Sequence, residues 1–517
     1  MNVSSKSLPP PDSFDLSADL VIVGGGGAGL AAAVRGGEIG AKVILLEKNP
    51  HLGGSTGIAV GSMSACGTSM QRAEGIEDDP AAHSEDIGKF KPELENRSNN
   101  GLRGFFTENS AATIEWLREL GVQFHGPIQE PPNRVARMHN IVPNAKAYVA
   151  VMHRRALRLG VKVRTKTTVT SLYRNDEGAI VGVKTEDASG KSRSIEAIGG
   201  VILATGDFSA NAEMKRKYMS DIEAEVEAIN PTASGEGQLL GLSVGAELRN
   251  MDVALGPQIR FVPPAKKPFA QLLPTTPCLA KFMAWVAAIM PNFLFQRFVK
   301  SLLVTWQHPE QMLFDEGAVL INREGKRFTN ELDRPANDIP KQTNKVAYYV
   351  FDHTLATQFS EWPHFISTAP GISYAYVPDY KKLRPDVYAQ ADSLEALAQA
   401  IGVPGDALKE TAGEIGACRA GSSRDVFERE RFAKGLEQAP FYALGPAKSW
   451  IVLTEGGLAV NERLEVLNDS GAAIPGLFAG GTGAQGGMII WGHGLHICWA
   501  VTSGRLAAES ACSRIPR

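Results

Sequence analysis

The sequence lacks an excess of charge of either sign, and it contains little cysteine. A formal net charge of −3 over 517 residues is far from the basic surplus of nucleic-acid binders, so no nucleic-acid partner is predicted. The five cysteines form no CxxC pair, no haem-attachment motif and no zinc spacing, which predicts buried thiols in a reducing cytoplasm and no metal site. Residues 1–18 hold no long apolar run and are expected to form a flexible tail.

A glycine-rich turn follows the first apolar run of the chain. Residues 19–23 (DLVIV) lead into GGGGAG, an alanine-rich segment follows, and the apolar run 42–47 (KVILLE) ends at Glu47. This order indicates strand, turn, helix and strand. Gly24 permits the tight turn, the next glycines let the backbone approach a pyrophosphate, and Gly29 lets helix and strand pack closely. An acid about 20 residues further on accepts hydrogen bonds from ribose hydroxyls, so a dinucleotide site is predicted.

Chain length and the distribution of apolar runs predict two domains. A chain of 517 residues exceeds the size at which one hydrophobic core stops growing. Apolar runs that end in glycine occur near both chain ends, whereas residues 258–450 are rich in proline, aromatics and amphipathic helical stretches. The predicted fold class is therefore α/β: a discontinuous Rossmann-type domain of residues 19–257 and 451–517, with an inserted α+β capping domain of residues 258–450.

One apolar stretch, residues 279–306, has three interpretations. It is rich in Phe, Trp, Met and Leu, but Lys281, Pro291, Arg297 and Lys300 interrupt it, which argues against a membrane-spanning helix. The stretch forms the wall of an apolar substrate channel, an oligomer interface or a patch that dips into a membrane surface. The channel and the interface are favoured.

Six ordered motifs carry a family resemblance. They read VIVGGGGAGL, LLEKNPHLGGST, ILATGDF, INREGKRFTNE, TEGGLAV and IPGLFAGGTGAQGG, and they span most of the chain. In this order they resemble the FAD-dependent fumarate reductase and succinate dehydrogenase flavoprotein family, including its 3-ketosteroid dehydrogenase-type branch. The resemblance implies FAD, a capping domain over the flavin ring and an oxidoreductase reaction on CH–CH groups. Serine stands where succinate dehydrogenases use a histidine to hold FAD covalently, so noncovalent FAD is expected.

The residues expected to bind FAD lie in five segments of the sequence. These are the glycine turn, the second strand end with the glycine pair after it, a small-residue corner near residue 205, a glycine pair near residue 480, and the start of the last helix. The positive end of that helix is expected beside the flavin N1/C2 carbonyl, where it stabilises anionic reduced flavin. The expected residues are Gly24, Gly26, Gly27, Ala28, Gly29, Glu47, Lys48, Gly54, Ser55, Thr56, Gly61, Ala204, Thr205, Gly206, Asp207, Gly480, Gly481, Gly494, Leu495 and His496.

The leading catalytic candidate is Arg334. In the family that this chain resembles, the proton-transfer residue lies about four positions after the glutamate of GKRFxNE, and Arg334 stands one position early. The alternative is that this arginine only joins a surface network with the acids Asp333, Glu331 and Asp338.

Further catalytic candidates lie at the flavin edge and in the cap. His493 and the N–H group of Gly494 are placed to bind a carbonyl oxygen, whereas His496, one turn into the helix, is also expected to pack in the core. Tyr374 and Tyr376 can donate a phenolic proton, and packing is the alternative role for both.

The substrate end of the site departs from the fumarate-reducing relatives. Where these carry cationic groups for two carboxylates, this sequence has Gly256, Leu453 and Trp491. Ile490, Trp491 and Gly256 are instead expected to line an apolar substrate site. The predicted reaction is desaturation or reduction of a C–C bond adjacent to a carbonyl in an apolar, cyclic or steroid-like ketone. Hydride passes to or from flavin N5, and a side chain transfers the proton.

Three alternative functions stay open at this point. One is a flavin-dependent isomerase or hydratase without net redox chemistry, and another is a fumarate reductase-like enzyme for a different unsaturated acid. The third is an FAD-binding or membrane-docking protein without catalysis. For an oxidoreductase, the absence of haem motifs and iron–sulfur cysteines predicts an external electron acceptor or donor.

Overall fold

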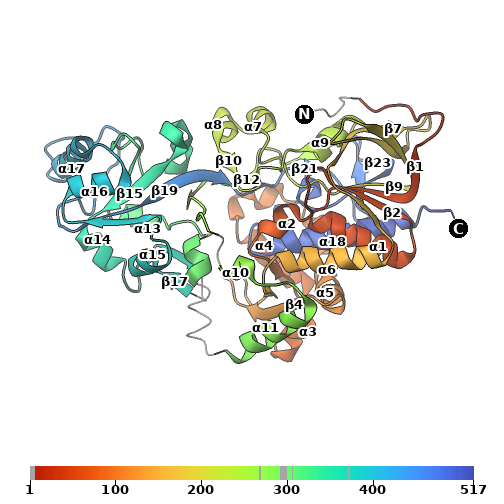
Figure 1. The fold of residues 1–517 in the computed structure, drawn as a ribbon, viewed down its shortest axis with the longest axis horizontal. Coiled ribbons are helices and arrows are strands. Elements are labelled where there is room, and N and C mark those ends of the chain that lie inside the picture. The colour runs from red at the N-terminus through yellow and green to blue at the C-terminus, as the bar shows by residue number, and fades with distance from the viewer. Residues whose placement is uncertain (1–5, 267–268, 291–299, 306, 370–372, 517) are drawn as a thin grey trace.

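The computed structural model describes residues 6–266, 269–290, 300–305, 307–369 and 373–516. Its main sheet has the order β22-β23-β9-β1-β2-β6, and Figure 1 shows that both ends of the chain contribute to it. β1 pairs in parallel with β2 and β9, and β23 continues the parallel set beside β9. The strands are β1 (Leu16–Val23), β2 (Val43–Leu46), β6 (Lys162–Arg164), β9 (Ser192–Leu203), β22 (Glu465–Leu467) and β23 (Ala473–Ala479).

Two helices from opposite ends of the chain pack together below this sheet (Figure 1). They are α1 (Gly27–Ile39), which begins at the glycine turn, and α18 (Leu495–Cys512). A Cβ atom on Gly504 would stand 2.1 Å from the carbonyl oxygen of Ala28, so the two backbones approach each other too closely for a side chain there. This close packing fixes the N-terminus of α18 beside the glycine turn.

Further elements of this region complete the walls around the helix pair. The antiparallel hairpin of β7 (Thr167–Arg174) and β8 (Ile180–Asp187) joins the main sheet because β8 pairs with β9. A small antiparallel sheet has the order β3-β5-β4 and lies near α18. Its strands and the neighbouring helices are β3 (Ser62–Ser64), β4 (Gln123–Ile128), β5 (Met138–Val142), α2 (Gly54–Ile58), α3 (Ser69–Ala73), α4 (Pro80–Gly88), α5 (Asn100–Glu119) and α6 (Lys146–Arg158).

A second sheet, at the left of Figure 1, organises the inserted part of the chain. Its order is β10-β19-β15-β14, and β13 and β18 also pair with the long strand β19. The strands are β10 (Glu227–Ala228), β13 (Gln258–Phe261), β14 (Val319–Ile321), β15 (Ala347–Phe351), β18 (Tyr388–Ala391) and β19 (Phe441–Ile451). The helices around it are α13 (Met312–Asp315), α14 (His353–Gln358), α15 (Val377–Leu383), α16 (Leu394–Ile401) and α17 (Gly405–Arg419).

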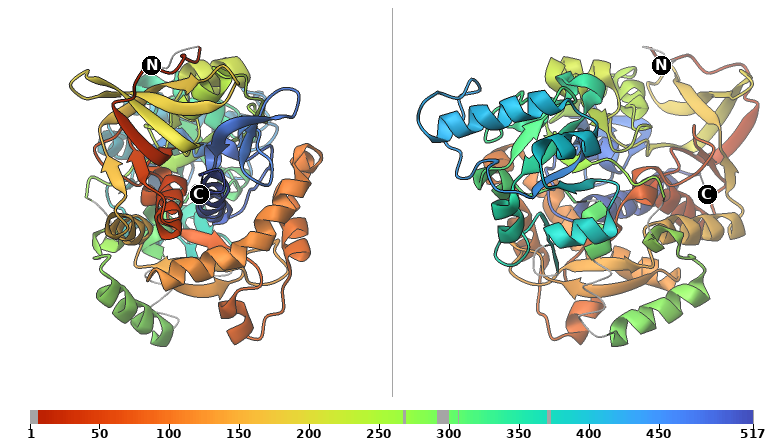
Figure 2. Two further views of the ribbon diagram at one scale, coloured as in Figure 1. Left: turned by 90° about the vertical axis from the view of Figure 1, so that its right-hand side faces the viewer. Right: turned by 60° about the vertical axis from the view of Figure 1, so that its left-hand side comes forward.

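The hydrophobic cores of the two sheets are separate. The core around the main sheet runs from Ala18 to Ala511 but has no buried member between 247 and 457. The two cores of the second sheet lie wholly between 259 and 447. Each sheet therefore buries its own apolar face, and Figure 2 shows both chain ends on the side of the main sheet.

Short elements connect the two sheets. α10 (Phe269–Leu272) is followed by α11 (Pro277–Ile289), which lies at the lower edge of the molecule in Figures 1 and 2. Of the apolar stretch 279–306, residues 291–299 and 306 lie outside the described residues. No helix in the described ranges combines the length and the apolar character needed to cross a membrane. The other connecting elements are α7 (Ala212–Tyr218), α8 (Asp221–Glu225), α9 (Glu236–Leu242), β11 (Leu248–Arg249), β12 (Ala254–Leu255), β16 (Ser367–Ala369), β17 (Ser373–Ala375), β20 (Leu453–Thr454) and β21 (Gly457–Leu458).

Candidate functional site

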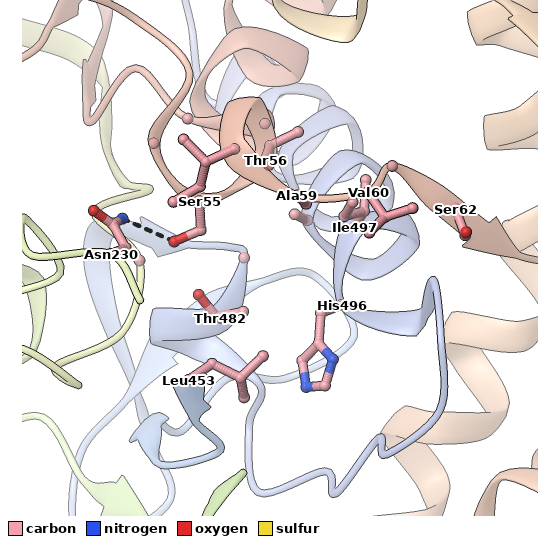
Figure 3. Close-up of a pocket in the computed structure, with 18 of the residues that line it drawn as sticks. Ser55, Thr56, Ala59, Val60, Ser62, Asn230, Leu453, Thr482, His496 and Ile497 are labelled. Carbon is pink, nitrogen blue, oxygen red and sulfur yellow. Dashed lines mark hydrogen bonds between the residues drawn. The ribbon is translucent and has the colours of Figure 1, made fainter. Parts of the chain in front are cut away.

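A cavity of about 980 Å³ extends from the glycine turn to α11. This volume lies at the upper end of the roughly 300–1,000 Å³ typical of ligand pockets. Its walls come from the N-termini of α1, α2 and α18, from β4 and β5, and from the short strands near residue 453. Figure 3 shows part of this wall, with His496 and Leu453 pointing into the space between Ser62 and Asn230.

Most glycines of the turn leave no room for a side chain. Gly24 adopts φ 107°, and a Cβ there would lie 2.3 Å from the carbonyl oxygen of Ala204. On Gly29 a Cβ would stand 1.8 Å from the carbonyl oxygen of Gly24, and on Gly27 it would stand 2.5 Å from Thr56 Oγ1. The N-terminus of α1 is capped by Gly26 without a side-chain hydrogen bond, so its first N–H groups can bind phosphate. The turn therefore fits a pyrophosphate.

Glu47 is held where a ribose would lie. Its side chain is buried but lines the cavity. Oε2 accepts a hydrogen bond from the Gly25 N–H at 2.7 Å, and Oε1 accepts one from the Asn49 N–H at 2.8 Å. A carboxylate offers about four lone-pair sites, so these two bonds orient Glu47 and leave acceptor capacity for ribose hydroxyls.

Polar residues of three further segments continue the wall of the cavity. Asn230 donates a hydrogen bond to Ser55 Oγ at 2.8 Å, which Figure 3 shows as a dashed line. Lys48 donates to Ser234 Oγ at 2.5 Å and to Glu236 Oε1 at 2.6 Å. Burial raises the pKa of Asp207, although its bonds with Ser209 oppose the rise.

At the N-terminus of α18, His493 and Glu130 form a hydrogen-bonded dyad. Glu130 Oε1 accepts from His493 Nδ1 in a short contact, and it also accepts from the His493 backbone N–H at 3.2 Å. Glu130 is buried, whereas 56% of the His493 side chain is exposed and lines the cavity. The hydrogen bond from Glu130 raises the pKa of His493 above 6.5, against the opposing effect of burial. With Nδ1 bonded to Glu130, Nε2 is left for a ligand.

Two further basic side chains lie near His493. Arg260 lines the cavity from β13 and donates to Gln258 Oε1 at 2.9 Å. Burial lowers the pKa of Arg260 to about 10. His308 has a pKa lowered to about 4, first by burial and then by the positive charges of Arg260 and His493. His308 is therefore neutral at pH 7, and Arg260 and His493 are the basic groups of this part that line the cavity.

A second histidine pair occupies the opposite side of the α18 N-terminus. His496 Nε2 lies 3.0 Å from Glu455 Oε1, and Glu455 is fully buried. Glu455 also accepts a hydrogen bond from Gln485. His496 thus lines the cavity from a fixed position (Figure 3) and does not pack only in the core.

Most residues predicted to bind FAD line this cavity together. His493 of the catalytic candidates does so as well, and Gly494, named for both roles, lies beside it. The cofactor candidates in the wall are Gly24, Gly26, Gly27, Ala28, Glu47, Lys48, Gly54, Ser55, Thr56, Gly61, Ala204, Thr205, Gly206, Asp207, Gly481, Gly494 and His496.

Three cofactor candidates lie behind the wall. Gly29 packs against Gly24, and Gly480 packs against Ser503 of α18, where a Cβ would lie 3.0 Å from Oγ. Leu495 is buried. These residues bring helix and strand together, and none of them lines the cavity.

Arg334 does not line the cavity in this structure. Its side chain is 83% exposed and lies 3.5 Å from Asp333, the arrangement that was the alternative to a catalytic role. Its backbone adopts the left-handed conformation, φ 46°, which is uncommon for a residue other than glycine. Glu331 of the same motif is buried between Arg327 and Arg429, at 2.8 and 3.0 Å, so this part of the motif holds the cap together.

The two tyrosine candidates also lie away from the cavity. Tyr374 packs against the rings of Trp362 and Phe365. Tyr376 lies under the ammonium group of Lys300 at 5.0 Å, and burial raises its pKa. Packing, the alternative role for both tyrosines, is what the structure shows for them.

The three residues predicted to bind substrate lie outside the cavity wall as well. Ile490 is fully buried in the core of the main sheet. Trp491 faces Lys91, whose ammonium group lies 4.6 Å from the ring centroid. A Cβ on Gly256 would stand 2.6 Å from the carbonyl oxygen of Trp450. The apolar lining comes instead from α11 and β4, including Phe282, Met283, Val286, Met290 and Ile128.

Sequence reasoning missed Glu130, Arg260 and His308. Glu130 lies in a proline-rich loop without a motif, 363 residues from His493, so no local signal pairs the two. Arg260 had a usable signal, because Ile259 and Phe261 on either side are buried and successive strand residues point to opposite faces.

Comparisons with known proteins agree with this geometry. The profile of a family described as FAD binding domain matches residues 19–267 and 280–493. A fumarate reductase (cytochrome) of Shewanella frigidimarina is 27% identical over 96% of this chain and 77% of its own length. A urocanate reductase of Eggerthella lenta is 26% identical over 92% of this chain and 71% of its own length.

Solved structures with the same fold cover nearly the whole chain. The open conformation of a flavocytochrome c3 fumarate reductase superimposes with a TM-score of 0.72 at 25% identity, over 98% of this chain and 80% of that one. A 3-ketosteroid-Δ4-(5α)-dehydrogenase of Rhodococcus jostii gives 0.60 at 22% identity, over 98% and 99%, and shows the fold alone. The predicted α/β fold class, the family resemblance and FAD as cofactor are thereby confirmed.

Proposed function

This chain belongs to the FAD binding domain family, and from that premise we propose that it is an FAD-dependent oxidoreductase of C–C bonds adjacent to a carbonyl. The substrate is a mainly apolar molecule such as a cyclic or steroid-like ketone, which the enzyme desaturates or reduces. FAD is held noncovalently, since Ser55 stands beside the glycine pair and accepts a hydrogen bond from Asn230. Electrons pass to or from an external carrier.

The observation that carries the proposal is that a single cavity has both a polar, glycine-rich wall and an apolar wall. One wall has the glycine turn and Glu47, which fit a dinucleotide, another has apolar residues of α11, and His493 and Arg260 line the same cavity. An apolar pocket with a few convergent polar groups and a perturbed histidine is the expected form of a substrate site.

Three groups of side chains would carry out proton transfer, carbonyl binding and exclusion of water. FAD, when bound, supplies the hydride donor or acceptor. His493, whose pKa the hydrogen bond with Glu130 raises, transfers the proton at the substrate α carbon: the protonated ring donates it in reduction, and the neutral ring accepts it in desaturation. Arg260 binds the carbonyl oxygen and stabilises negative charge that develops on it. The apolar side chains of α11 exclude water from both groups.

A second candidate function is reduction of an apolar unsaturated monocarboxylic acid. Arg260 favours it, because a partly buried guanidinium whose pKa burial lowers gains more from an anion than from a neutral carbonyl. One such arginine can bind one carboxylate, which favours a monocarboxylic acid. Relatives named fumarate reductase and urocanate reductase reduce unsaturated acids by name.

The proposed function is tested by flavin absorbance under anaerobic conditions. Chemically reduced holoenzyme is mixed with cyclic enones, 3-ketosteroids and unsaturated monocarboxylic acids, and oxidised holoenzyme is mixed with their saturated forms. Return or loss of the oxidised flavin band identifies the substrate class and the direction. If no compound changes the band, or if the product is isomerised without a change in flavin redox state, the proposal is wrong.

The proton-transfer role is tested with His493→Asn and a matched control, His125→Asn, in another histidine that lines the cavity. General acid–base groups contribute roughly 10²–10⁴-fold. We expect His493→Asn to lose turnover by that factor with FAD still bound, and His125→Asn to lose less than about tenfold. Equal losses in the two variants would remove His493 from the proposal.

A further inference from the structure

An exposed apolar face runs along α11. Of the fourteen large hydrophobic side chains exposed among the described residues, five lie between residues 272 and 289. Four of these follow one another on α11 at spacings of three and four residues, which places them on one side of a helix. They are Leu279, Phe282, Trp285 and Ile289. Clustered exposure of this kind marks an interaction surface, whereas single exposed apolar residues need no explanation.

The neighbouring face of the same helix lines the cavity. Met283, Val286 and Met290 form part of the cavity wall, and Phe282 belongs to both faces because it lines the cavity and is 58% exposed. α11 packs against β4 and β5, whose residues also line the cavity. The helix therefore has one face on the apolar part of the cavity and another on the outside of the molecule, and Figure 2 shows it at the lower edge of the ribbon.

The chain around α11 carries positive charge only. No aspartate or glutamate occurs between Asp252 and Glu310, although the chain has 56 acidic residues, and six lysines and arginines fall in this interval. Lys266 and Lys281 are exposed, and among the described residues no ion pair is formed by either of them. Lys300 pairs with Asp379 at 3.1 Å. A basic surface beside exposed aromatic and aliphatic residues matches an anionic lipid surface.

We propose that α11 docks on the surface of a membrane that contains anionic lipids. Its 13 residues span about 20 Å, short of the roughly 30 Å hydrocarbon core, so the helix lies in the interfacial plane. The exposed side chains enter the acyl region, Lys281 contacts headgroups, and the apolar end of the cavity faces the bilayer. A substrate dissolved in the lipid then reaches the cavity past Phe282 without crossing water.

A second copy of the chain fits this surface less well. A twofold interface places the same patch against itself, so the helix that carries Lys281 would meet its own copy, and the interval between Asp252 and Glu310 offers no acid to either lysine. The like charges oppose that contact and favour an anionic partner.

The proposal is tested by flotation of the FAD-loaded protein with lipid vesicles. One set contains phosphatidylcholine alone, and the other contains phosphatidylcholine with phosphatidylglycerol. We expect binding to the anionic vesicles, weakened but not abolished by high salt, since burial of apolar side chains is insensitive to screening. Trp285→Ser with Ile289→Ser should lower binding to both vesicle types by at least about tenfold. Lys281→Glu should lower binding to the anionic vesicles only.

The matched control is Trp362→Ser, because Trp362 is exposed to a similar degree but lies in the cap, outside α11. Neither Trp285 nor Ile289 lines the cavity, so all variants should retain FAD, and flavin absorbance checks their folding. Failure of the wild-type protein to float overturns the proposal, and so does an equal loss in Trp362→Ser. A wild-type dimer that Trp285→Ser with Ile289→Ser turns into a monomer, without any vesicle binding, assigns the face to a second copy instead. Docking can succeed even if the proposed reaction is wrong, because flotation involves no substrate.

Discussion

Replacement of Glu130 by glutamine should lower the pKa of His493. The carboxylate raises the pKa of His493 above 6.5 through a hydrogen bond to Nδ1. Charge-assisted hydrogen bonds contribute about 1.5–3 kcal/mol, and one pKa unit corresponds to about 1.4 kcal/mol. Since 56% of the His493 side chain is exposed, solvent screening favours the lower end of this range. Glutamine keeps the shape and a neutral acceptor oxygen, so the lost charge is the only large change.

The pKa can be measured without knowledge of the substrate. Proton–carbon NMR spectra of protein with labelled histidine show at most ten Cε1–H signals, one for each histidine, and His493→Asn identifies the one that belongs to His493. Glu455→Gln serves as the control, because Glu455 contacts His496 and should leave the midpoint of His493 unchanged. The reasoning is refuted if the titration midpoint of His493 is unchanged in Glu130→Gln, or if it shifts equally in Glu455→Gln.

The same dyad should appear in the pH dependence of stability. A histidine with a raised folded-state pKa contributes stability that is fully present below its unfolded value of about 6.5 and is lost as pH rises through the folded value. Wild-type protein should therefore lose stability across that window in denaturant titrations, and Glu130→Gln should lose less. Reductive turnover should fall in the same window, because a proton donor must be protonated, and the fall should begin at lower pH in the variant.

Three further predictions follow from the geometry. Gly29→Ala places a Cβ 1.8 Å from the carbonyl oxygen of Gly24, so we expect the purified protein to lack FAD and to unfold at lower denaturant concentration by at least about 1–3 kcal/mol. Glu331→Ala leaves the buried Arg429 unpaired and should destabilise the cap by about 3–5 kcal/mol, measured as an earlier unfolding transition with the FAD domain retained. Arg334→Met removes a side chain that is 83% exposed. Because exposed ion pairs contribute little, this variant should lower turnover less than about tenfold. A loss as large as that of His493→Asn would indicate that the cap closes and brings Arg334 to the cavity.

The cofactor end of the site could be predicted from sequence because its requirements are local. A phosphate turn needs glycine at fixed offsets from a strand and a helix, and Gly24, Gly27 and Glu47 lie within 24 consecutive residues. Gly206 and Gly481 are distant in sequence, yet each also follows a strand end, where the carboxyl ends of parallel strands meet. Because the backbone geometry of the turn requires glycine at these positions, the requirement is visible in the sequence.

The substrate end could not be predicted because its residues meet only through the tertiary fold. Glu130 follows β4, His493 precedes α18, and the small sheet beside α18 brings them together. Trp491, at a position where relatives carry a cation, was expected to line an apolar substrate site. Its ring instead contacts the ammonium group of Lys91. The apolar wall comes from α11. Most of this helix lies in the stretch 279–306, for which the sequence favours a channel wall or an oligomer interface without deciding between them.

The distribution of polarity along the cavity limits how a substrate can lie. Backbone N–H groups and Glu47 form one wall, the α11 side chains form another, and His493 and Arg260 line the same cavity. A molecule with one carbonyl gains most when that group meets Arg260 and its apolar body lies along α11. A second charged group on the substrate would then face Met283 and Val286, where desolvation opposes its binding. The same polarity therefore selects against dicarboxylates and favours compounds that partition into the lipid surface that we assign to α11.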